Sequence, residues 1–451
     1  MNITFAGAAD TVTGSRHLIE VPGFRLLLDC GLFQGFKTLR ERNWSTLGFD
    51  ARSVSAVVLS HAHLDHCGFL PVLTKLGFRG SVYCSQATRD LAEVMLLDSA
   101  HLLEEEAKHA NRYGYSKHAP AQPLYTVDDV KRCLQNIKPL PFNTTFKLSK
   151  NLSIELTPAG HLLGAASVIV RHHDMQLVYS GDLGRNEDLL MPPPSAVHAA
   201  DVLLVESTYG NRVHPADDPM QQLGDIIRAT VGRGGMVLMP SFAVGRAQAL
   251  MLAIERLKQQ NAIPDVPVFL DSPMASKATA IYRRHAKLLR IPKEEVPAMC
   301  ESAKFISTPD ESRALSASSA PCVIIAGSGM ATGGRILHHL KAHAPNSRNH
   351  IVFPGFQVPG TRGAKLVAGE PTVKIHGEYV PVKAKVSHIE GFSGHADASE
   401  LIDWLTQFRA APGSTFVVHG EREASDALRL LIKDSLGWDA RAVEHMQRVS
   451  V

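Results

Sequence analysis

The sequence lacks the features that mark several large classes of protein. Its six cysteines are scattered over 451 residues and form no C-x-x-C pair, which argues against a disulfide framework and against a zinc site built from thiolates. No apolar stretch reaches the roughly 18 residues that span a bilayer, and the opening MNITFAGAAD lacks a basic segment followed by a long apolar one. We therefore expect a cytoplasmic protein without a membrane partner, whose cysteines are reduced and buried.

An excess of charge of one sign is absent as well. The chain has 47 Lys and Arg residues against 44 Asp and Glu residues, a formal net charge of +3 at pH 7. A protein that holds nucleic acid by charge alone usually carries a larger positive excess, so this balance permits a nucleic-acid partner without requiring one. There are also no internal repeats and no low-complexity tracts, and 45% of the residues are hydrophobic, which predicts a globular protein with one or two large cores.

The sequence does contain an alternation of short apolar runs with longer amphipathic ones, which is typical of an α/β fold. Apolar runs separated by turns rich in Gly, Pro and Ser predict strands at residues 2–7, 15–21, 24–30 and 56–60. A long helix is predicted at about residues 88–113, where the charge run LLEEEAKHA indicates a solvated face rather than a binding site. Further strands are predicted at residues 152–158, 166–170, 175–180 and 201–207.

Beyond Tyr209 the pattern becomes a regular alternation of strand and helix, which implies βαβ units on a mostly parallel sheet. The expected strands are GMVLMPSF, VPVFLDS, CVIIAG and HIVFPGF. We therefore predict a second domain at residues 208–362, inserted between residues 1–207 and 363–451 of the first. The final EHMQRVSV fits either an edge strand or a subunit contact, and its residues favour neither.

The stretch VVLSHAHLDHCGFLP, residues 57–71, places four metal-binding side chains directly after an apolar run: His61, His63, Asp65 and His66. Histidines at positions i and i+2 at the mouth of a strand can point to one centre, and the Asp-His pair that follows can face an adjacent one. Imidazole and carboxylate together suit zinc or a similar divalent ion. Two metal ions are therefore favoured over one, and over the alternative of a polar surface loop.

Four more polar residues follow apolar runs at expected strand ends, where α/β folds place their sites. They are Asp29, His161, Asp182 and His419. Each by itself fits a capping or turn residue. Together they could complete the coordination of two metal ions.

In combination, these motifs closely resemble the metallo-β-lactamase superfamily: an Asp after a strand, HAHLDH, GHLLG around His161 and SGDLG around Asp182. The segments ESTYGN, GFSGHAD and VVHGE are similar to the further motifs of the β-CASP nucleases, and PSFAVGRAQ, LDSPMA and GSGMATGGR are similar to segments of their inserted domain. The similarity covers most of the chain. HAHLDHCG and ESTYG are more similar to the nuclease subunit of the pre-mRNA cleavage and polyadenylation specificity factor, and to its short prokaryotic relatives, than to ribonuclease J.

This resemblance implies an α/β fold in which a metallo-β-lactamase αββα sandwich is interrupted by a β-CASP domain of parallel-sheet α/β type. It divides the ligands between two ions: His61, His63 and His161 for the first, Asp65, His66 and His419 for the second, with Asp182 bridging both. Asp29 would orient the cluster by hydrogen bonding to a ligand. Two Zn²⁺ ions are expected, with Mn²⁺ and Fe²⁺ as alternatives, and a pair about 3.5 to 4 Å apart would activate a hydroxide for attack on a phosphodiester.

His395 is the candidate acid that gives a proton to the departing 3′-oxygen, because the attacking hydroxide lies on the opposite face. Glu206 resembles the residue that pairs with this histidine in the family, and a carboxylate beside an imidazole favours the protonated form. With Asp65 and Asp182, these two are the expected catalytic residues. The alternative is that His395 is only a turn residue in FSGHADAS.

The loop GSGMATGGR supplies candidate substrate-binding residues. Ser328, Gly329 and Met330 would offer backbone N–H groups to a phosphate ahead of a helix. Three arginines are expected to contact the RNA backbone because of their charge and the resemblance. Each equally fits a solvated surface residue or a salt-bridge partner. They are Arg246, Arg335 and Arg362.

We therefore predict a two-zinc ribonuclease that hydrolyses phosphodiester bonds of single-stranded RNA and leaves a 5′-phosphate and a 3′-hydroxyl. Similarity to the cleavage subunit favours endonuclease activity, with 5′-exonuclease activity as a possible accompaniment. RNA is favoured over DNA because the DNA-processing branch of the family usually lacks a histidine at the position of His419. The alternatives are a DNA nuclease, a small-molecule metallohydrolase, which would have no use for the inserted domain, and an inactive RNA-binding subunit. A homodimer stays open.

Overall fold

The chain divides into two compact units in the computed structural model, which describes residues 1–358 and 360–451. The first unit consists of Met1–Asn186, Pro193–Val213 and His395–Val451, and the second of Glu187–Pro192 and His214–Gly394. The units therefore change along the chain near residues 213 and 394, whereas the sequence-based division has its boundaries at 207 and 362. That division stays a prediction about domains.

Two seven-stranded sheets form the centre of the first unit. One has the order β22-β1-β2-β3-β4-β5-β6, with β1 (Asn2–Gly7), β2 (Arg16–Val21), β3 (Phe24–Leu28), β4 (Ala56–Val58), β5 (Ser81–Ser85), β6 (Ile137–Leu140) and β22 (Arg448–Ser450). The other has the order β21-β20-β11-β10-β9-β8-β7, with β7 (Phe146–Lys147), β8 (Leu152–Pro158), β9 (Ala166–His172), β10 (Met175–Tyr179), β11 (Val202–Glu206), β20 (Ser414–Val418) and β21 (Ala440–Ala442). Apolar side chains of both sheets, such as Phe5, Leu28, Leu156 and Phe416, form one core.

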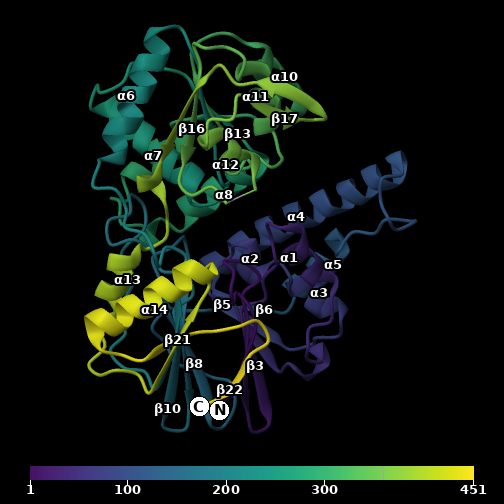
Figure 1. The fold of residues 1–451 in the computed structure, drawn as a ribbon, viewed down its shortest axis with the longest axis vertical. Helices are drawn as coiled ribbons and strands as arrows, with labels where there is room; N and C mark the ends of the chain where they lie inside the picture. Colours follow the sequence, from purple (N-terminus) through teal and green to yellow (C-terminus); the bar gives the residue numbers. More distant parts are fainter. Residues whose placement is uncertain (359) are drawn as a thin grey trace. The chain divides into compact units, whose positions relative to one another are not determined.

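Helices lie against both of these sheets. The α-helices of this unit are α1 (Lys37–Glu41), α2 (Leu64–Cys67), α3 (Leu70–Lys75), α4 (Gln86–Tyr113), α5 (Val127–Leu134), α13 (Ala398–Leu405) and α14 (Arg422–Leu436). Helix α4 contacts β5 and β6 of one sheet, while α14 contacts β20 and β21 of the other (Figure 1). The αββα sandwich expected from the sequence is therefore confirmed.

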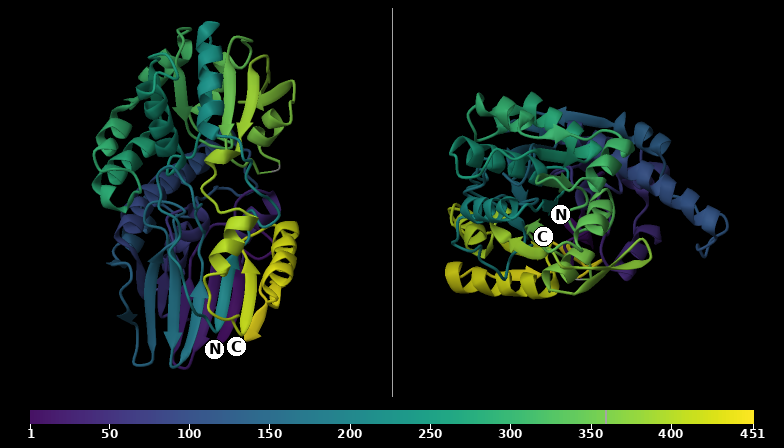
Figure 2. Two further views of the ribbon diagram at one scale, coloured as in Figure 1. Left: turned by 90° about the vertical axis from the view of Figure 1, so that its left-hand side faces the viewer. Right: turned by 90° about the horizontal axis from the view of Figure 1, so that it is seen from above.

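The two ends of the chain meet at the edge of the first sheet. Strand β22 pairs antiparallel with β1, and the amino group of Met1 donates to the carbonyl of Val451 at 2.9 Å. The two termini accordingly lie side by side in both further views (Figure 2). Of the two alternatives for the C-terminal segment, the structure contains the edge strand. In the described part of the chain, no helix has the length and apolar character that a membrane span requires.

The second unit contains a six-stranded sheet of order β14-β13-β15-β12-β16-β19, in which every neighbouring pair is parallel. Its strands are β12 (Val237–Pro240), β13 (Val268–Asp271), β14 (Lys304–Phe305), β15 (Val323–Ala326), β16 (His350–Pro354) and β19 (Lys385–Ile389). A separate hairpin is formed by β17 (Thr372–Ile375) and β18 (Glu378–Pro381). The predicted parallel-sheet α/β architecture of the inserted domain is therefore confirmed.

Seven helices accompany this sheet in the described residues: α6 (Pro219–Gly232), α7 (Arg246–Gln259), α8 (Pro273–Arg284), α9 (Glu295–Glu301), α10 (Pro309–Ala317), α11 (Ile336–His343) and α12 (Arg362–Val367). Figure 1 shows α6 and α7 on one side of β16 and β13 and α10 and α11 on the other. Strand residues such as Leu238 and Ile351 form a core with Ile336 and Leu340 of α11. The sheet is thus buried by helices, as parallel sheets require.

Candidate metal centre

The candidate ligands of the first unit follow the carboxyl ends of its strands. Strands β3 and β4 are parallel, and the N–H of Asp29 donates to the carbonyl of Val58 at 2.8 Å, which brings Asp29 beside the segment that starts at Ser60. In the other sheet, β10, β11 and β20 are parallel neighbours. The side chains that follow or end these strands, Asp182, Glu206 and His419, therefore meet at one edge.

Three of the predicted histidines form a first ligand group. His63 Nδ1 lies 3.1 Å from His61 Nε2 and 3.2 Å from His161 Nε2. Oδ2 of Asp182 lies 3.6 Å from His61 Nε2 and 3.8 Å from His161 Nε2. One ligand atom from each of these four residues lies within 4.8 Å of the others, so all four can face one ion.

The second ligand group lies on the other side of the same carboxylate. His66 Nε2 lies 2.9 Å from His419 Nε2, and Asp65 Oδ2 lies 3.9 Å and 3.7 Å from these two nitrogens. Oδ1 of Asp182 lies 3.3 Å from His66 Nε2 and 3.4 Å from His419 Nδ1. The two oxygens of Asp182 therefore face different groups of ligands.

Several of these side chains have protonation states that suit metal ligands, whereas His66 holds a proton that a bound cation would replace. Burial opposes the charged form of His66, but the carboxylates of Asp182, Asp29 and Asp65 raise its pKa well above the ordinary value. Burial holds the pKa of His61 well below its ordinary value and lowers the pKa of His63 to about 4, so both imidazoles are neutral at pH 7. Burial opposes the charged form of Asp182, but the imidazoles of His419, His66 and His61 hold its pKa well below the ordinary value. The pKa of Asp65 is likewise lowered to about 2, because His66 and His419 outweigh its burial.

Asp29 lies behind the second ligand group and is fully buried. Its Oδ1 accepts from the Ser60 N–H at 2.7 Å, and its Oδ2 accepts from Ser60 Oγ at 2.8 Å and from the Tyr179 hydroxyl at 2.6 Å. His66 Nδ1 lies 2.7 Å from the same Oδ2. This contact turns Nε2 of His66 toward the ligand group and fixes the direction of its ring.

Three residues of this network were not identified from the sequence: Ser60, Tyr179 and Ser15, whose Oγ donates to Asp29 Oδ2 at 3.4 Å. Burial and the Asp29 carboxylate raise the pKa of Tyr179 well above its ordinary value, so the hydroxyl keeps its proton and donates. Ser60 is the last residue of the apolar run AVVLS and directly precedes His61, a signal that could have been used. Tyr179 lies 150 positions from Asp29 in the sequence, so no local pattern indicates that they meet.

His395 and Glu206 lie beside the first ligand group. His395 Nδ1 is 3.5 Å from Glu206 Oε1 and 3.9 Å from Asp182 Oδ2, and its ring centre is 4.3 Å from that of His161. Glu206 is fully buried, and its two oxygens accept from the N–H groups of Leu183 at 2.6 Å and of Thr208 at 3.1 Å. Burial lowers the pKa of His395, but Glu206 and the other carboxylates raise it by more, so the net shift is upward.

The donor set fits a divalent cation. Two imidazole nitrogens at the distance between His66 Nε2 and His419 Nε2 repel each other unless a proton or a cation lies between them. Oδ1 of Asp182 is buried and makes no hydrogen bond within the described part of the chain. A neutral imidazole and an ionised carboxylate are what zinc and similar ions bind, so the chemistry of the site and its geometry agree.

The glycine-rich loop belongs to the second unit and follows β15. The N–H of Ser328 donates to the carbonyl of Gly333 at 3.2 Å. Within the described residues, the N–H groups of Gly329 and Met330 donate to no backbone acceptor, and their assignment as phosphate contacts stays a prediction. The loop is held from outside, because Gln357 Nε2 donates to the Gly329 carbonyl at 3.2 Å and the Gly363 N–H donates to the Met330 carbonyl at 2.9 Å.

The three candidate arginines of the second unit make internal contacts. Arg335 pairs with Asp271 at 2.5 Å, Arg246 donates to the carbonyl of Pro354, and Arg362 donates to the carbonyls of Lys374 and Ala331. Of the alternatives given for Arg335, the structure therefore contains the salt bridge. Their assignment as RNA contacts stays a prediction.

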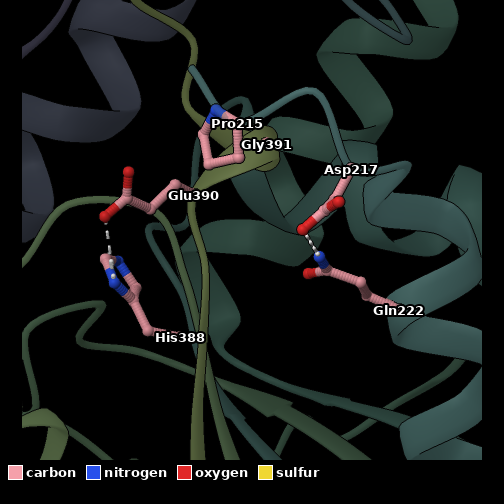
Figure 3. Close-up of a pocket in the computed structure, with 6 residues that line it drawn as sticks. All are labelled: Pro215, Asp217, Gln222, His388, Glu390 and Gly391. Atoms are coloured by element: carbon pink, nitrogen blue, oxygen red, sulfur yellow. Dashed lines mark hydrogen bonds and ion pairs between the residues drawn. The ribbon is translucent and has the colours of Figure 1, made fainter. Parts of the chain in front are cut away.

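The second unit also contains a pocket of about 240 Å³ that none of the candidate residues lines (Figure 3). The carboxylates in its wall are already paired, because His388 Nδ1 lies 3.5 Å from Glu390 and Gln222 donates to Asp217 at 3.2 Å. Pro215 and Gly391 complete the wall. Carboxylates repel phosphate, so this pocket does not suit an RNA backbone.

Comparison with known protein families gives three matches along the chain. The metallo-beta-lactamase superfamily domain matches residues 18–200, and the Beta-Casp domain matches residues 247–366. The Zn-dependent metallo-hydrolase RNA specificity domain matches residues 379–443. The three matches follow one another in the order that the motifs predict.

Curated relatives match almost the whole chain. Ribonuclease TTHA0252 of Thermus thermophilus is 40% identical over 442 residues, which cover 96% of each protein. Transcription termination factor FttA of Methanocaldococcus jannaschii is 33% identical over 96% of this chain and 69% of its own length. The RNase J-like protein of the same organism is 30% identical over 96% of both chains.

A solved structure supports the fold independently. The crystal structure of a protein of unknown function from Enterococcus faecalis V583 aligns with a TM-score of 0.56 at 14% identity, over 100% of this chain and 99% of that one. At this identity the likeness concerns the fold alone. The relatives above are similar enough to decide the family: the chain belongs to the β-CASP family of the metallo-β-lactamase superfamily, whose members use divalent metal ions.

Proposed function

We propose that this chain is a ribonuclease that hydrolyses phosphodiester bonds of single-stranded RNA with two divalent ions, zinc in the first place and Mn²⁺ or Fe²⁺ as alternatives. The observation that carries the proposal is the position of Asp182. Its Oδ2 faces His61 and His161, and its Oδ1 faces His66 and His419. A carboxylate whose oxygens face two separate ligand groups is what a bridged pair of ions requires.

His61, His63 and His161 would hold one ion, and Asp65, His66 and His419 the other. Cations bound there lower the pKa of a water molecule and neutralise charge on phosphoryl oxygens. Asp29 would keep His66 in the ligand-competent tautomer through its bond to Nδ1. The protein would therefore contribute buried side chains whose ligand atoms are held in fixed directions.

His395 would protonate the departing 3′-oxygen. Glu206 is held by two backbone amides, so its carboxylate has a fixed position beside the imidazole. The raised pKa of His395 favours the proton-bearing ring near neutral pH, after the opposing effect of burial. The products would carry a 5′-phosphate and a 3′-hydroxyl.

The names of the relatives support RNA as the substrate, since two of them are called ribonuclease or RNase J-like protein. The matching Zn-dependent metallo-hydrolase domain is described as an RNA specificity domain. A DNA nuclease is the alternative within the same chemistry, and His419, which completes the second ligand group, favours RNA by resemblance. A cytoplasmic location is part of the proposal and rests on the sequence alone.

The test is incubation of the purified protein with end-labelled single-stranded RNA and with DNA of the same sequence, beside a sample stripped of metal. We expect RNA to be cut faster than DNA, only by the metal-loaded protein, with 5′-phosphate products. Equal rates on RNA and DNA would contradict the choice of substrate, and full activity after metal removal would contradict the mechanism.

Endonuclease activity is a separate part of the proposal. A covalently closed circular RNA offers no end, so only internal cutting can open it. We expect the metal-loaded protein to produce linear RNA from the circle. If circles persist while a linear 5′-monophosphate RNA of the same sequence is degraded to mononucleotides, the protein is an exonuclease.

A further inference from the structure

An exposed aromatic ring lies beside the glycine-rich loop of the second unit. Phe242, in the loop after β12, is 41% exposed, while its neighbours Ser241, Ala243 and Val244 are buried. An aromatic ring left in solvent loses the free energy that burial would provide. A single exposed ring is common on protein surfaces, so its surroundings must show whether it has a use.

The ring of Phe242 rests on the backbone of Gly329. A Cβ at position 329 would lie 2.8 Å from Cδ2 and 3.0 Å from Cε2 of this ring, and 2.9 Å from the backbone nitrogen of Phe242. Any side chain at 329 would therefore displace the ring. Because the Phe242 carbonyl accepts from the Ala247 N–H at 3.2 Å and the Gly329 carbonyl accepts from Gln357, the backbone on both sides of the contact is fixed.

The position in the sheet is one where α/β proteins bind ligands. Strands β12 and β15 are adjacent and parallel, with Pro240 opposite Ala326, so the loops that carry Phe242 and Gly329 start side by side at the carboxyl end. From there the chain passes from β12 to β13, which lies beyond β15, and from β15 to β16, which lies beyond β12. The amides of Gly329 and Met330, which donate to no backbone acceptor in the described chain, belong to the same loop.

We propose that Phe242 is a stacking platform for one nucleobase of single-stranded RNA, next to a phosphate bound by the Gly329 and Met330 amides. The inference rests on the proposed function for its substrate and adds a base-binding subsite to it. Every nucleobase has a π face, so such a platform accepts any sequence. Bases of a duplex are stacked on each other and cannot reach the ring, so the subsite selects single strands.

The experiment measures binding and cleavage separately in the metal-loaded, full-length protein. Binding is followed by the fluorescence anisotropy of a 12-nucleotide phosphorothioate RNA, which resists hydrolysis, and of versions with one abasic nucleotide at successive positions. Initial rates on the unmodified RNA give KM and kcat. The variants are Phe242→Ala, Phe242→Leu, which keeps an apolar side chain without a π face, and Phe242→Trp. Tyr113→Ala, which removes an exposed aromatic ring from the end of α4, is the matched control.

We expect Phe242→Ala and Phe242→Leu to weaken binding and raise KM by roughly 5- to 100-fold, the range for loss of one stacked base, with kcat within about threefold of wild type. Phe242→Trp and Tyr113→Ala should bind as wild type does. In the wild type, one abasic position should weaken binding, and this penalty should vanish in Phe242→Ala. The leucine variant keeps the test valid if the alanine variant fails to fold.

Unchanged binding in Phe242→Leu, or the same abasic penalty with and without the ring, overturns the platform while the nuclease proposal stands. If RNA binding depends on Phe242 but the protein cleaves no RNA, the nuclease proposal is overturned and the base-binding subsite is supported. If the wild type binds no RNA, both are wrong. Equal loss of affinity for the base-containing RNA and for a fully abasic strand would also overturn stacking, since the ring would then act without a base.

Discussion

Each unit contains a buried aspartate next to histidine at the end of a strand, yet the two sites differ in kind. Asp271 ends β13 and accepts from Ser312 Oγ at 2.5 Å, from Arg335 at 2.5 Å and from His339 Nε2 at 2.7 Å. Asp182 in the first unit faces imidazole nitrogens at 3.3 to 3.8 Å. Asp271 is therefore saturated by hydrogen-bond donors, whereas Asp182 faces imidazoles that can also act as metal ligands.

The two sites differ in the groups that compensate the negative charge of the buried carboxylate. Burial opposes the charged form of Asp271, and the donors His339, Ser312 and Arg335 lower its pKa by more, so the group is a complete structural network. The other ring nitrogen of His339 lies 3.0 Å from Ser316 Oγ and is also satisfied. No arginine or lysine pairs with Asp182 in the described chain. A buried Asp-His pair thus indicates a metal site only where ligand atoms converge and no guanidinium supplies the charge.

The largest effect should come from Asp182→Ala, because it removes the proposed bridge between the two ligand groups. We expect metal content to fall and RNA cleavage to become undetectable. Elemental analysis and cleavage of end-labelled RNA measure the two losses. A variant that keeps two ions per chain would show that Asp182 does not bridge.

His395→Ala should separate chemistry from metal binding. It should keep both metal ions and a normal fold while cleavage slows by roughly 10²- to 10⁴-fold, the usual scale of a general acid. Glu206→Gln should reproduce part of this loss, because the imidazole loses its carboxylate partner. Normal turnover in His395→Ala would reduce both residues to structural roles.

Asp271→Ala tests the other half of the comparison. It leaves Arg335 and His339 buried or half-buried without their partner, and we expect a loss of stability of about 3 to 5 kcal/mol. Metal content should stay at the wild-type value. Chemical denaturation and elemental analysis on the same sample check both, and a loss of metal without a loss of stability would reverse the assignment of the two sites.

Tyr179→Phe should have the smallest effect, because it removes only the hydroxyl that bonds to Asp29 and Ser15 behind the candidate ligands. Losing the donor to Asp29 should weaken metal affinity by roughly 10- to 100-fold, measured by competition with a chelator. Ser312→Ala removes the corresponding donor to Asp271 and is the matched control, which should leave metal affinity unchanged. Equal metal affinity in wild type and Tyr179→Phe would mean that Asp29 is positioned by its other donors, Ser15 and Ser60, without the tyrosine hydroxyl.

The sequence predicted the architecture well, because hydrophobic periodicity is a local signal. The strands expected at residues 2–7 and 152–158 are β1 and β8 with the same bounds, and the helix expected at about 88–113 is α4, which begins at Gln86. The helix starts earlier because the Ser85 hydroxyl accepts from the Thr88 N–H and caps it. The candidate metal ligands were also identifiable, since ligand-type side chains gather where apolar runs end.

What the sequence could not predict depends on contacts between distant segments. Arg335 lies in a loop that suggests phosphate binding, but Asp271, 64 positions away, engages it. Phe242 is one apolar residue in a run of them, and only the approach of Gly329 shows that its ring stays at the surface. Pairings of this kind arise from strand order, which single-sequence patterns do not encode.

The most direct test of the central claim is the number of divalent ions bound per chain, measured by titrating metal-stripped protein with zinc and analysing the dialysed product. The account predicts two ions in the wild type, fewer in Asp182→Ala, and two in both His395→Ala and Asp271→Ala. A wild-type protein that cleaves RNA at its full rate with a single bound ion would contradict it.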